Sequence, residues 1–224
     1  MDRMSLQQWF PGIYLIGQFN WLRTGCWLLH HGNQAALLEM PPAGLREADP
    51  ASVAQAALAA LPNVTVKYLL CTHAHLDHYS SRTHRRLRAA FPEAQTCVQR
   101  GFSRWLTSTS RVLHFDDELQ LELSGEPLFL VHASKHSWTD TMVIFRGVVC
   151  TGDWELGTIR SVHDWKPFMS VPNAQKLDAI SRMEHFPTAH HYHIHSLYSV
   201  HANDRREGVD FPQLMANTRE DRPL

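Results

Sequence analysis

The stretch CTHAHLDHYS, residues 71 to 80, places three histidines and one aspartate within six residues. Side chains alternate in an extended segment, so His73 and His75 point the same way and can hold one metal ion. Asp77 and His78 follow where the chain must turn, and they can reach a second ion about 3.5–4 Å away. Nitrogen and carboxylate ligands without cysteine suit Zn²⁺, and also iron or manganese. The alternative, a solvated polar loop, explains this density of ligand-type residues less well.

The elements around this motif predict a layered α/β fold. The segment 64–72 (VTVKYLLCT) has the short apolar run of a buried strand, and the motif stands at its end. Helices are expected from Asp49–Pro50 onward, from Ser80 or Ser81 to Phe91, and from Asn173 to about Glu184. Other strands are expected at 12–18, 26–31, 35–39, 95–99, 112–115, 118–123, 127–133, 141–145 and 147–153, with a last strand entering AHHYHIH. This order predicts a mixed α/β sandwich with helices outside two sheets.

Length and composition set broad limits on the class of protein. The 224 residues fit a single domain, 1–224, in which 203–224 is expected to be an extended C-terminal tail or to pack Phe211 and Leu214 against the body or a second subunit. A formal net charge of -1 indicates neither nucleic acid nor an anionic membrane as partner. Four cysteines without a CxxC pair, and an N-terminus without a signal sequence, predict reduced thiols and a cytoplasmic location.

The quoted motif has the form HxHxDH, and with it the sequence resembles the metallo-β-lactamase superfamily. The resemblance implies an αββα four-layer sandwich of two mixed β-sheets flanked by helices. It also implies a histidine after a later strand, and His136 follows the strand PLFLVHA, with His132 as the competing candidate. The Pro-Gly usual before that histidine is replaced by Ser134 and Lys135, and glycine there normally tolerates positive φ.

Two further landmarks of the superfamily complete the implied ligand set. GVVCTGDW supplies Asp153 as the carboxylate that bridges both metals. A late histidine after a strand is sought in MEHFPTAHHYHIH, where the preceding proline and small residues favour His190, with His191 second. The resemblance then assigns His73, His75 and His136 to one metal and Asp77, His78 and His190 to the other, with Asp153 between them.

The implied activity is metal-dependent hydrolysis of a small molecule. A hydroxide activated by two cations, of which Zn²⁺ is the preferred candidate, would attack an ester, thioester, lactone or phosphoester. Asp77 would orient that hydroxide or pass a proton to the leaving group. The sequence has no GxSxG elbow and no Walker loop. One alternative is a persulfide dioxygenase-like oxidoreductase with a single iron held by His73, His136 and Asp153. A non-catalytic metal-binding protein is the other.

The loop from Glu155 to Asn173 follows Asp153 directly and is a candidate for substrate selection. It contains Arg160, His163, Trp165, Lys166 and Phe168. The hypothesis is that it overhangs the metals, and that Arg160 or Lys166 meets an anionic group. The competing interpretation is a packing loop whose aromatic residues belong to the core.

Overall fold

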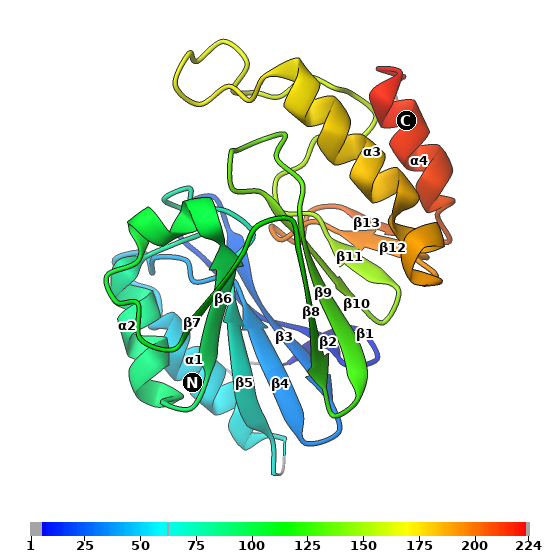
Figure 1. Ribbon diagram of the computed structural model, residues 1–224. Helices are drawn as coiled ribbons and strands as arrows, with labels where there is room; N and C mark the ends of the chain where they lie inside the picture. Colours follow the sequence, from blue (N-terminus) through cyan, green and yellow to red (C-terminus); the bar gives the residue numbers. More distant parts are fainter. Residues whose placement is uncertain (1–5, 62, 223–224) are drawn as a thin grey trace.

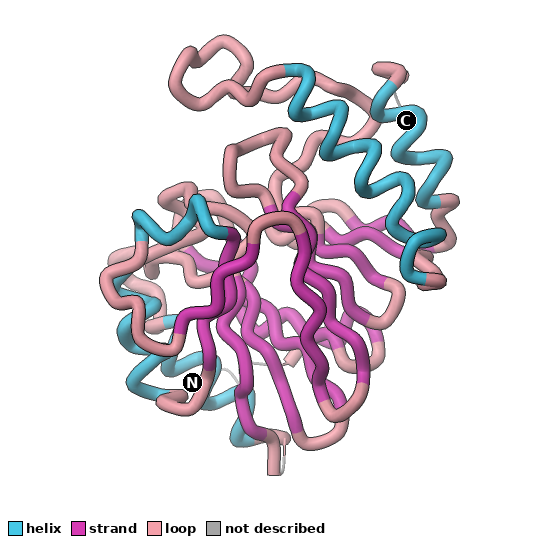
Figure 2. The backbone as a smooth tube through the Cα atoms, in the orientation of Figure 1, coloured by secondary structure: helices cyan, strands magenta, loops and turns pink. Residues whose placement is uncertain are grey.

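The computed structural model describes residues 6–61 and 63–222, which form two facing β-sheets with helices on their outer sides (Figure 1, Figure 2). In these residues the first sheet holds seven strands in sequence order: β1 (Gln7–Phe10), β2 (Ile13–Phe19), β3 (Thr24–His31), β4 (Gln34–Leu38), β5 (Thr65–Leu70), β6 (Gln95–Gln99) and β7 (Val112–Phe115). The second sheet has the order β13-β12-β11-β10-β9-β8. Its strands are β8 (Glu118–Leu123), β9 (Glu126–His132), β10 (Thr141–Phe145), β11 (Val148–Cys150), β12 (Ser196–Tyr198) and β13 (Arg205–Glu207).

Both sheets are mixed, as the sequence predicts. β3 and β4 are antiparallel whereas β4 and β5 are parallel, and in the second sheet β11 and β12 are the parallel pair. The central strands read as continuous apolar runs because both of their faces are buried. In β3, Trp27 and Leu29 face the core between the sheets, while Cys26 and Leu28 face the helical side. The αββα sandwich is therefore confirmed.

Two helices, α1 (Pro50–Ala59) and α2 (Ser81–Ala90), cover the outer face of the first sheet (Figure 1). Ser80 caps α2, since its side chain accepts a hydrogen bond from the backbone N–H of Thr83. The cap fixes the direction in which the chain leaves the HxHxDH motif. Leu87 and His84 of α2 are buried against the sheet.

The other two helices, α3 (Asn173–His190) and α4 (Phe211–Arg219), cover the outer face of the second sheet (Figure 1). α3 is longer than predicted, because it continues through Pro187 and ends only at His190. The residue that follows, His191, has a left-handed φ of 50°. Within 203–222 the chain forms β13 and α4 in place of an extended tail. Phe211 and Leu214 pack against the body, as the alternative prediction for this segment had it. No helix in the described ranges is long and apolar enough to cross a bilayer.

Three elements differ from the sequence prediction besides these. β1 and a short 3-10 helix, η1 (Arg100–Trp105), were not predicted. The last strand, expected to enter AHHYHIH, forms only after it, as β12. Residues 151–195, which contain α3, therefore connect the adjacent parallel strands β11 and β12, and a parallel pair requires such a crossover.

Candidate metal centre

Each chain segment that reaches the candidate centre follows the end of a strand. The HxHxDH motif follows β5, His136 follows β9, Asp153 follows β11, and His201 follows β12. Functional groups gather at such strand ends because the loops there need not satisfy a sheet ladder. Both sheets therefore contribute, and the side chains converge where the two sheets meet at one end.

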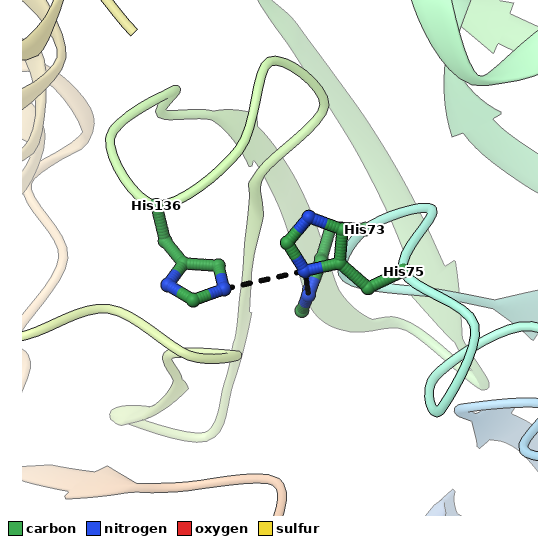
Figure 3. A group of neighbouring side chains, drawn as sticks. All are labelled: His73, His75 and His136. Carbon is green, nitrogen blue, oxygen red and sulfur yellow. Dashed lines mark hydrogen bonds between the residues drawn. The ribbon is translucent and has the colours of Figure 1, made fainter. Parts of the chain in front are cut away.

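The first group of potential ligands consists of three histidines, shown in Figure 3. The Nε2 atom of His73 lies 3.0 Å from Nδ1 of His75, and Nε2 of His136 lies 3.3 Å from the same Nδ1. Three ring nitrogens thus point at one spot. A ring nitrogen that carries no proton offers one lone pair, so a cation placed among the three would take the position of the protons at these contacts.

The second group combines two carboxylates with two histidines: Asp77, His78, Asp153 and His201. Nε2 of His78 lies 3.1 Å from Oδ2 of Asp77, and Nε2 of His201 lies 3.0 Å from Oδ1 of Asp153. The other carboxylate oxygen, Oδ2 of Asp153, is 3.2 Å from Nε2 of His78. It is also 3.9 Å from Nε2 of His73 and 3.7 Å from Nε2 of His136. One carboxylate therefore touches both groups.

Polar partners orient several of the histidine rings through the nitrogen that faces away from the centre. Nδ1 of His73 lies 3.1 Å from the hydroxyl of Thr72, which in turn donates to Glu39. Glu39 is fully buried, and its Oε2 lies 3.5 Å from Nδ1 of His78. Nδ1 of His201 is 2.9 Å from the carbonyl oxygen of Leu22. Such contacts fix the ring orientation and the tautomer of a metal-binding histidine.

His136 is held by a different set of partners. Its Nδ1 lies 3.2 Å from Oε1 of Glu155, and Oε2 of Glu155 accepts from the ammonium of Lys135 at 2.8 Å. Oδ2 of Asp140 accepts from the backbone N–H groups of Lys135, His136 and Ser137 at 2.9, 2.7 and 2.8 Å. This carboxylate organises the turn, which explains how Ser134 and Lys135 replace the usual Pro-Gly.

The titration of the centre reflects its crowding. Burial, together with the nearby His136, lowers the pKa of His75 to about 4. Burial also lowers the pKa of His78, but Glu39 and Asp153 more than offset this and hold it well above the usual range. Burial raises the pKa of Asp153, yet contacts with His201 and His78 hold it far below its ordinary value. The carboxylates are thus ionised, and positive charge is favoured beside them.

The donor set fits a resident metal. Five histidines and two carboxylates present nitrogen and oxygen atoms without a thiolate, as zinc sites with open positions do. Oδ1 of Asp153 is buried and has no hydrogen-bond partner within the described part of the chain, even though His201 lies close by. A buried carboxylate oxygen left without a donor is costly, and a cation would satisfy it.

Six of the seven residues predicted as ligands converge: His73, His75, Asp77, His78, His136 and Asp153. The seventh, His190, does not and must be corrected. It is the last residue of α3, where its Nε2 lies 3.0 Å from Oε1 of Glu118 and its ring stacks on Phe186. His201 takes the place in the second group that was predicted for His190, and it was not among the ligands predicted from the sequence. Its signal was the apolar run SLYSV just before it, since a histidine after a strand was the landmark sought.

A cavity of about 760 Å³ opens over both groups, and His75, Asp77, His136, Asp153 and His201 lie in its wall. The loop before α3 contributes Val162, His163, Phe168 and Met169 to the same wall, in agreement with the hypothesis that it overhangs the centre. Arg160 and Lys166, which were expected to meet an anionic group, do not line the cavity. Arg160 pairs with Asp221 at 3.6 Å, and the ammonium of Lys166 lies over the ring of Trp165.

Solved structures share this fold. The metallo-β-lactamase SMB-1, bound to 2-mercaptoethanesulfonate, superposes with a TM-score of 0.64 at 14% identity over 99% of this chain and 96% of its own. A metallo-β-lactamase family protein from Thermus thermophilus gives 0.62 at 17% identity over 95% and 80%. The sec-alkyl sulfatase PisA1, as a double mutant, gives 0.65 at 12% identity over 97% of this chain and 41% of that one.

The chain therefore has the metallo-β-lactamase fold, and the resemblance inferred from HxHxDH is confirmed at that level. Neither a protein-family model nor a curated protein matches the sequence.

Proposed function

We propose that the protein is a hydrolase that uses two bound cations, most simply Zn²⁺, to cleave an ester, thioester, lactone or phosphoester bond of a small molecule. The observation that supports this most directly is Oδ2 of Asp153, which lies within 3.9 Å of ring nitrogens from both ligand groups. Cations bound there would lower the pKa of a water molecule and polarise a carbonyl or phosphoryl oxygen. Neighbours of the same fold named as a metallo-β-lactamase and a sec-alkyl sulfatase also support hydrolysis.

The chain supplies two complete sets of ligands in this proposal. His73, His75 and His136 would hold one cation, and Asp77, His78 and His201 would hold the second, with Asp153 shared. The completeness of the second set favours two cations over the single iron of a persulfide dioxygenase-like enzyme. Glu39, Thr72 and Glu155 would keep the rings aligned before a substrate arrives.

Asp77 is the residue we assign to proton transfer. Burial raises its pKa, but the hydrogen bond with His78 more than offsets this and keeps the pKa below its ordinary value. The carboxylate is therefore ionised at neutral pH. Its Oδ2 accepts from the hydroxyl of Thr24 at 3.3 Å, and the residue lies in the cavity wall. From there Oδ2 can orient an attacking water, accept its proton and return the proton to the leaving group.

Metal reconstitution tests the proposal. Protein stripped with a chelator is reloaded with Zn²⁺, and bound metal and turnover are measured on a panel of thioester, lactone, carboxylic ester and phosphodiester substrates. We expect about two ions per chain, activity only after reloading, and a loss on the order of 100-fold or more in Asp77→Asn. A single bound iron accompanied by oxygen uptake with a persulfide would instead establish the dioxygenase alternative.

A further inference from the structure

The exposed apolar side chains of this protein are concentrated around the candidate metal centre. Ten large hydrophobic residues are exposed among those described, and six of them line the cavity over the centre. We call these six the apolar collar: Leu22, Leu76, Trp105, Trp138, Val162 and Phe168. Exposed hydrophobic residues are normally scattered singly over a surface, whereas a contiguous patch marks a binding site.

The collar is assembled from distant parts of the chain. Leu22 follows β2, Leu76 lies inside the HxHxDH motif, and Trp105 ends η1. Trp138 comes from the loop between β9 and β10, and the remaining two come from the loop before α3. Five separate segments thus turn apolar side chains toward one space. Packing of the fold does not explain this, because the side chains remain exposed.

Charge is scarce in this wall. Arg104 is the one lysine or arginine among the described residues that line the cavity, and its guanidinium packs 5.5 Å from the ring of Trp105. The carboxylates that line it, Asp77 and Asp153, belong to the metal centre. The cavity therefore has a polar floor that can hold cations and an apolar wall. Its volume of about 760 Å³ lies within the range of small-molecule sites, roughly 300–1,000 Å³.

Phe168 is the member of the apolar collar that most clearly lacks a packing partner in the protein without a ligand. Its side chain is 96% exposed, although the loop that carries it is anchored on both sides. On one side Glu155 binds the buried Lys135, and on the other the buried Lys176 of α3 pairs with Asp164. The loop is thus held over the centre while Phe168 has nothing to pack against. An apolar ligand in the cavity would supply that contact.

We propose that the substrate carries a medium-length to long aliphatic or aryl group, which lies along the apolar collar while the bond to be cleaved lies at the metal centre. The placement of the cleaved bond rests on the proposed hydrolytic function, whereas the apolar binding does not. Each methylene that enters the collar leaves water, and binding should tighten roughly three- to fourfold per methylene until the space is filled.

Binding of plain alkanols tests the collar without any catalysis. 1-Butanol, 1-hexanol and 1-octanol are titrated into the metal-free protein and followed by tryptophan fluorescence, to which Trp105 and Trp138 report directly. We expect the dissociation constant to fall on the order of 100-fold from butanol to octanol. No detectable binding, or binding that does not tighten with length, would overturn the inference.

Two variants locate the binding. Phe168→Ala should weaken octanol binding at least about threefold. Leu45→Ala, at another fully exposed apolar residue that does not line the cavity, should leave it unchanged. Equal effects of the two variants would contradict binding at the collar. A lipid surface is the other possible source of an apolar ligand, and sedimentation with phosphatidylcholine vesicles tests it. Capture by vesicles without length-dependent alkanol binding would mean that the collar docks on lipid surfaces and does not bind a small molecule.

Turnover separates this inference from the proposed function. With zinc-loaded protein, kcat/KM for 4-nitrophenyl esters should rise from acetate to octanoate, and the rise should be reduced in Phe168→Ala. If alkanols bind as expected but no substrate in any panel is cleaved, the hydrolytic proposal fails and the collar stands. If the acetate ester is cleaved as fast as the octanoate ester and alkanols do not bind, hydrolysis stands and the collar fails.

Discussion

The buried Lys135 and the half-buried Glu155 form an ion pair beside the candidate metal centre. The side chain of Lys135 is fully buried, and its ammonium also donates to the carbonyl oxygen of Arg160 at 3.0 Å. Burial raises the pKa of Glu155, but hydrogen bonds from His136 and Lys135 more than offset this and hold the pKa well below its usual range. The pair therefore stays charged at neutral pH, and it joins a predicted ligand to the loop before α3.

Breaking this pair on one side should cost much more than removing it entirely. Glu155→Gln leaves a buried ammonium without its carboxylate, and we expect the free energy of unfolding to fall by about 3 kcal/mol. Adding Lys135→Met removes the stranded charge, so the double variant should recover most of that loss. Urea unfolding of the metal-free proteins measures both. A double variant no more stable than Glu155→Gln would mean that the charge of Lys135 is not what the carboxylate balances.

His201 and His190 give a matched pair of substitutions for the last ligand. His201→Ala removes one of the side chains that touch Asp153, so we expect zinc content to fall toward about one ion per chain and activity to drop on the order of 100-fold. His190→Ala breaks contacts with Glu118 and Phe186, away from the centre, and should leave both unchanged. Metal analysis after dialysis is the measurement. Retention of full zinc content in His201→Ala would remove this residue from the ligand set.

The ligand set shows how far local sequence context reaches. The HxHxDH spacing is enough to predict that its four ligand-type residues converge, because they lie within one short stretch of chain and need no help from the rest of the fold. The last ligand depends instead on where a strand ends. α3 carries His190 away from the centre by continuing past Pro187, and nothing in the local composition predicts that a helix tolerates proline there.

At the scale of elements, α2 is joined to the first sheet through a buried histidine. Nε2 of His84 lies 2.9 Å from the hydroxyl of Thr96 in β6, and Nδ1 lies 3.3 Å from the hydroxyl of Tyr79. Burial lowers the pKa of His84 to about 4, with a further contribution from Arg88. The imidazole is therefore neutral in the folded protein, and protonation opposes the docking of α2.

This interaction predicts a specific pH dependence of stability. Between the folded pKa of about 4 and the unfolded value near 6.5, the unfolded chain binds more protons, so the folded state loses stability as pH falls through that window. Wild type should lose about 2 kcal/mol more than His84→Gln between about pH 7 and about pH 5. Urea unfolding at the two pH values tests this. The exposed His185→Gln is the control, and an identical pH response of all three proteins would refute it.

The helices and strands also differ in how well they could be predicted from the sequence. The predicted helices and most strands formed where apolar periodicity and turn residues placed them. α4 had a visible signal, since Phe211, Leu214, Met215 and Thr218 are spaced to share one helical face behind the capping residue Asp210. The polar remainder of that segment hid the pattern. β1 and β13 are only four and three residues long, too short to carry a period of two.

At the scale of the whole molecule, the candidate centre joins the two sheets. His73, His75, Asp77 and His78 come from the first half of the chain. The remaining candidate ligands, His136, Asp153 and His201, come from loops of the second sheet. A cation bound by both would bind only the folded protein. Metal binding is therefore expected to stabilise the sandwich as a unit.

Zinc should consequently raise the unfolding temperature of the stripped protein. At a free concentration about 1,000 times the dissociation constant, the gain is about 4 kcal/mol, which corresponds to roughly 10 °C for a chain of this length. Scanning calorimetry of stripped and reloaded protein measures it. Mg²⁺ is the control, since it prefers oxygen ligands and should leave the unfolding temperature where it was. An equal response to both ions would indicate nonspecific binding.

The crossover between β11 and β12 has one more consequence. The segment from about Trp165 to Ser170 lies between the anchor at Asp164 and the start of α3, and it takes part in no sheet ladder. We expect that this stretch can be exchanged for sequences of other length and chemistry while Asp153 and His201, fixed by their own strands, keep their positions. A set of grafts at this one place would then yield variants of altered ligand selectivity on an unchanged metal centre.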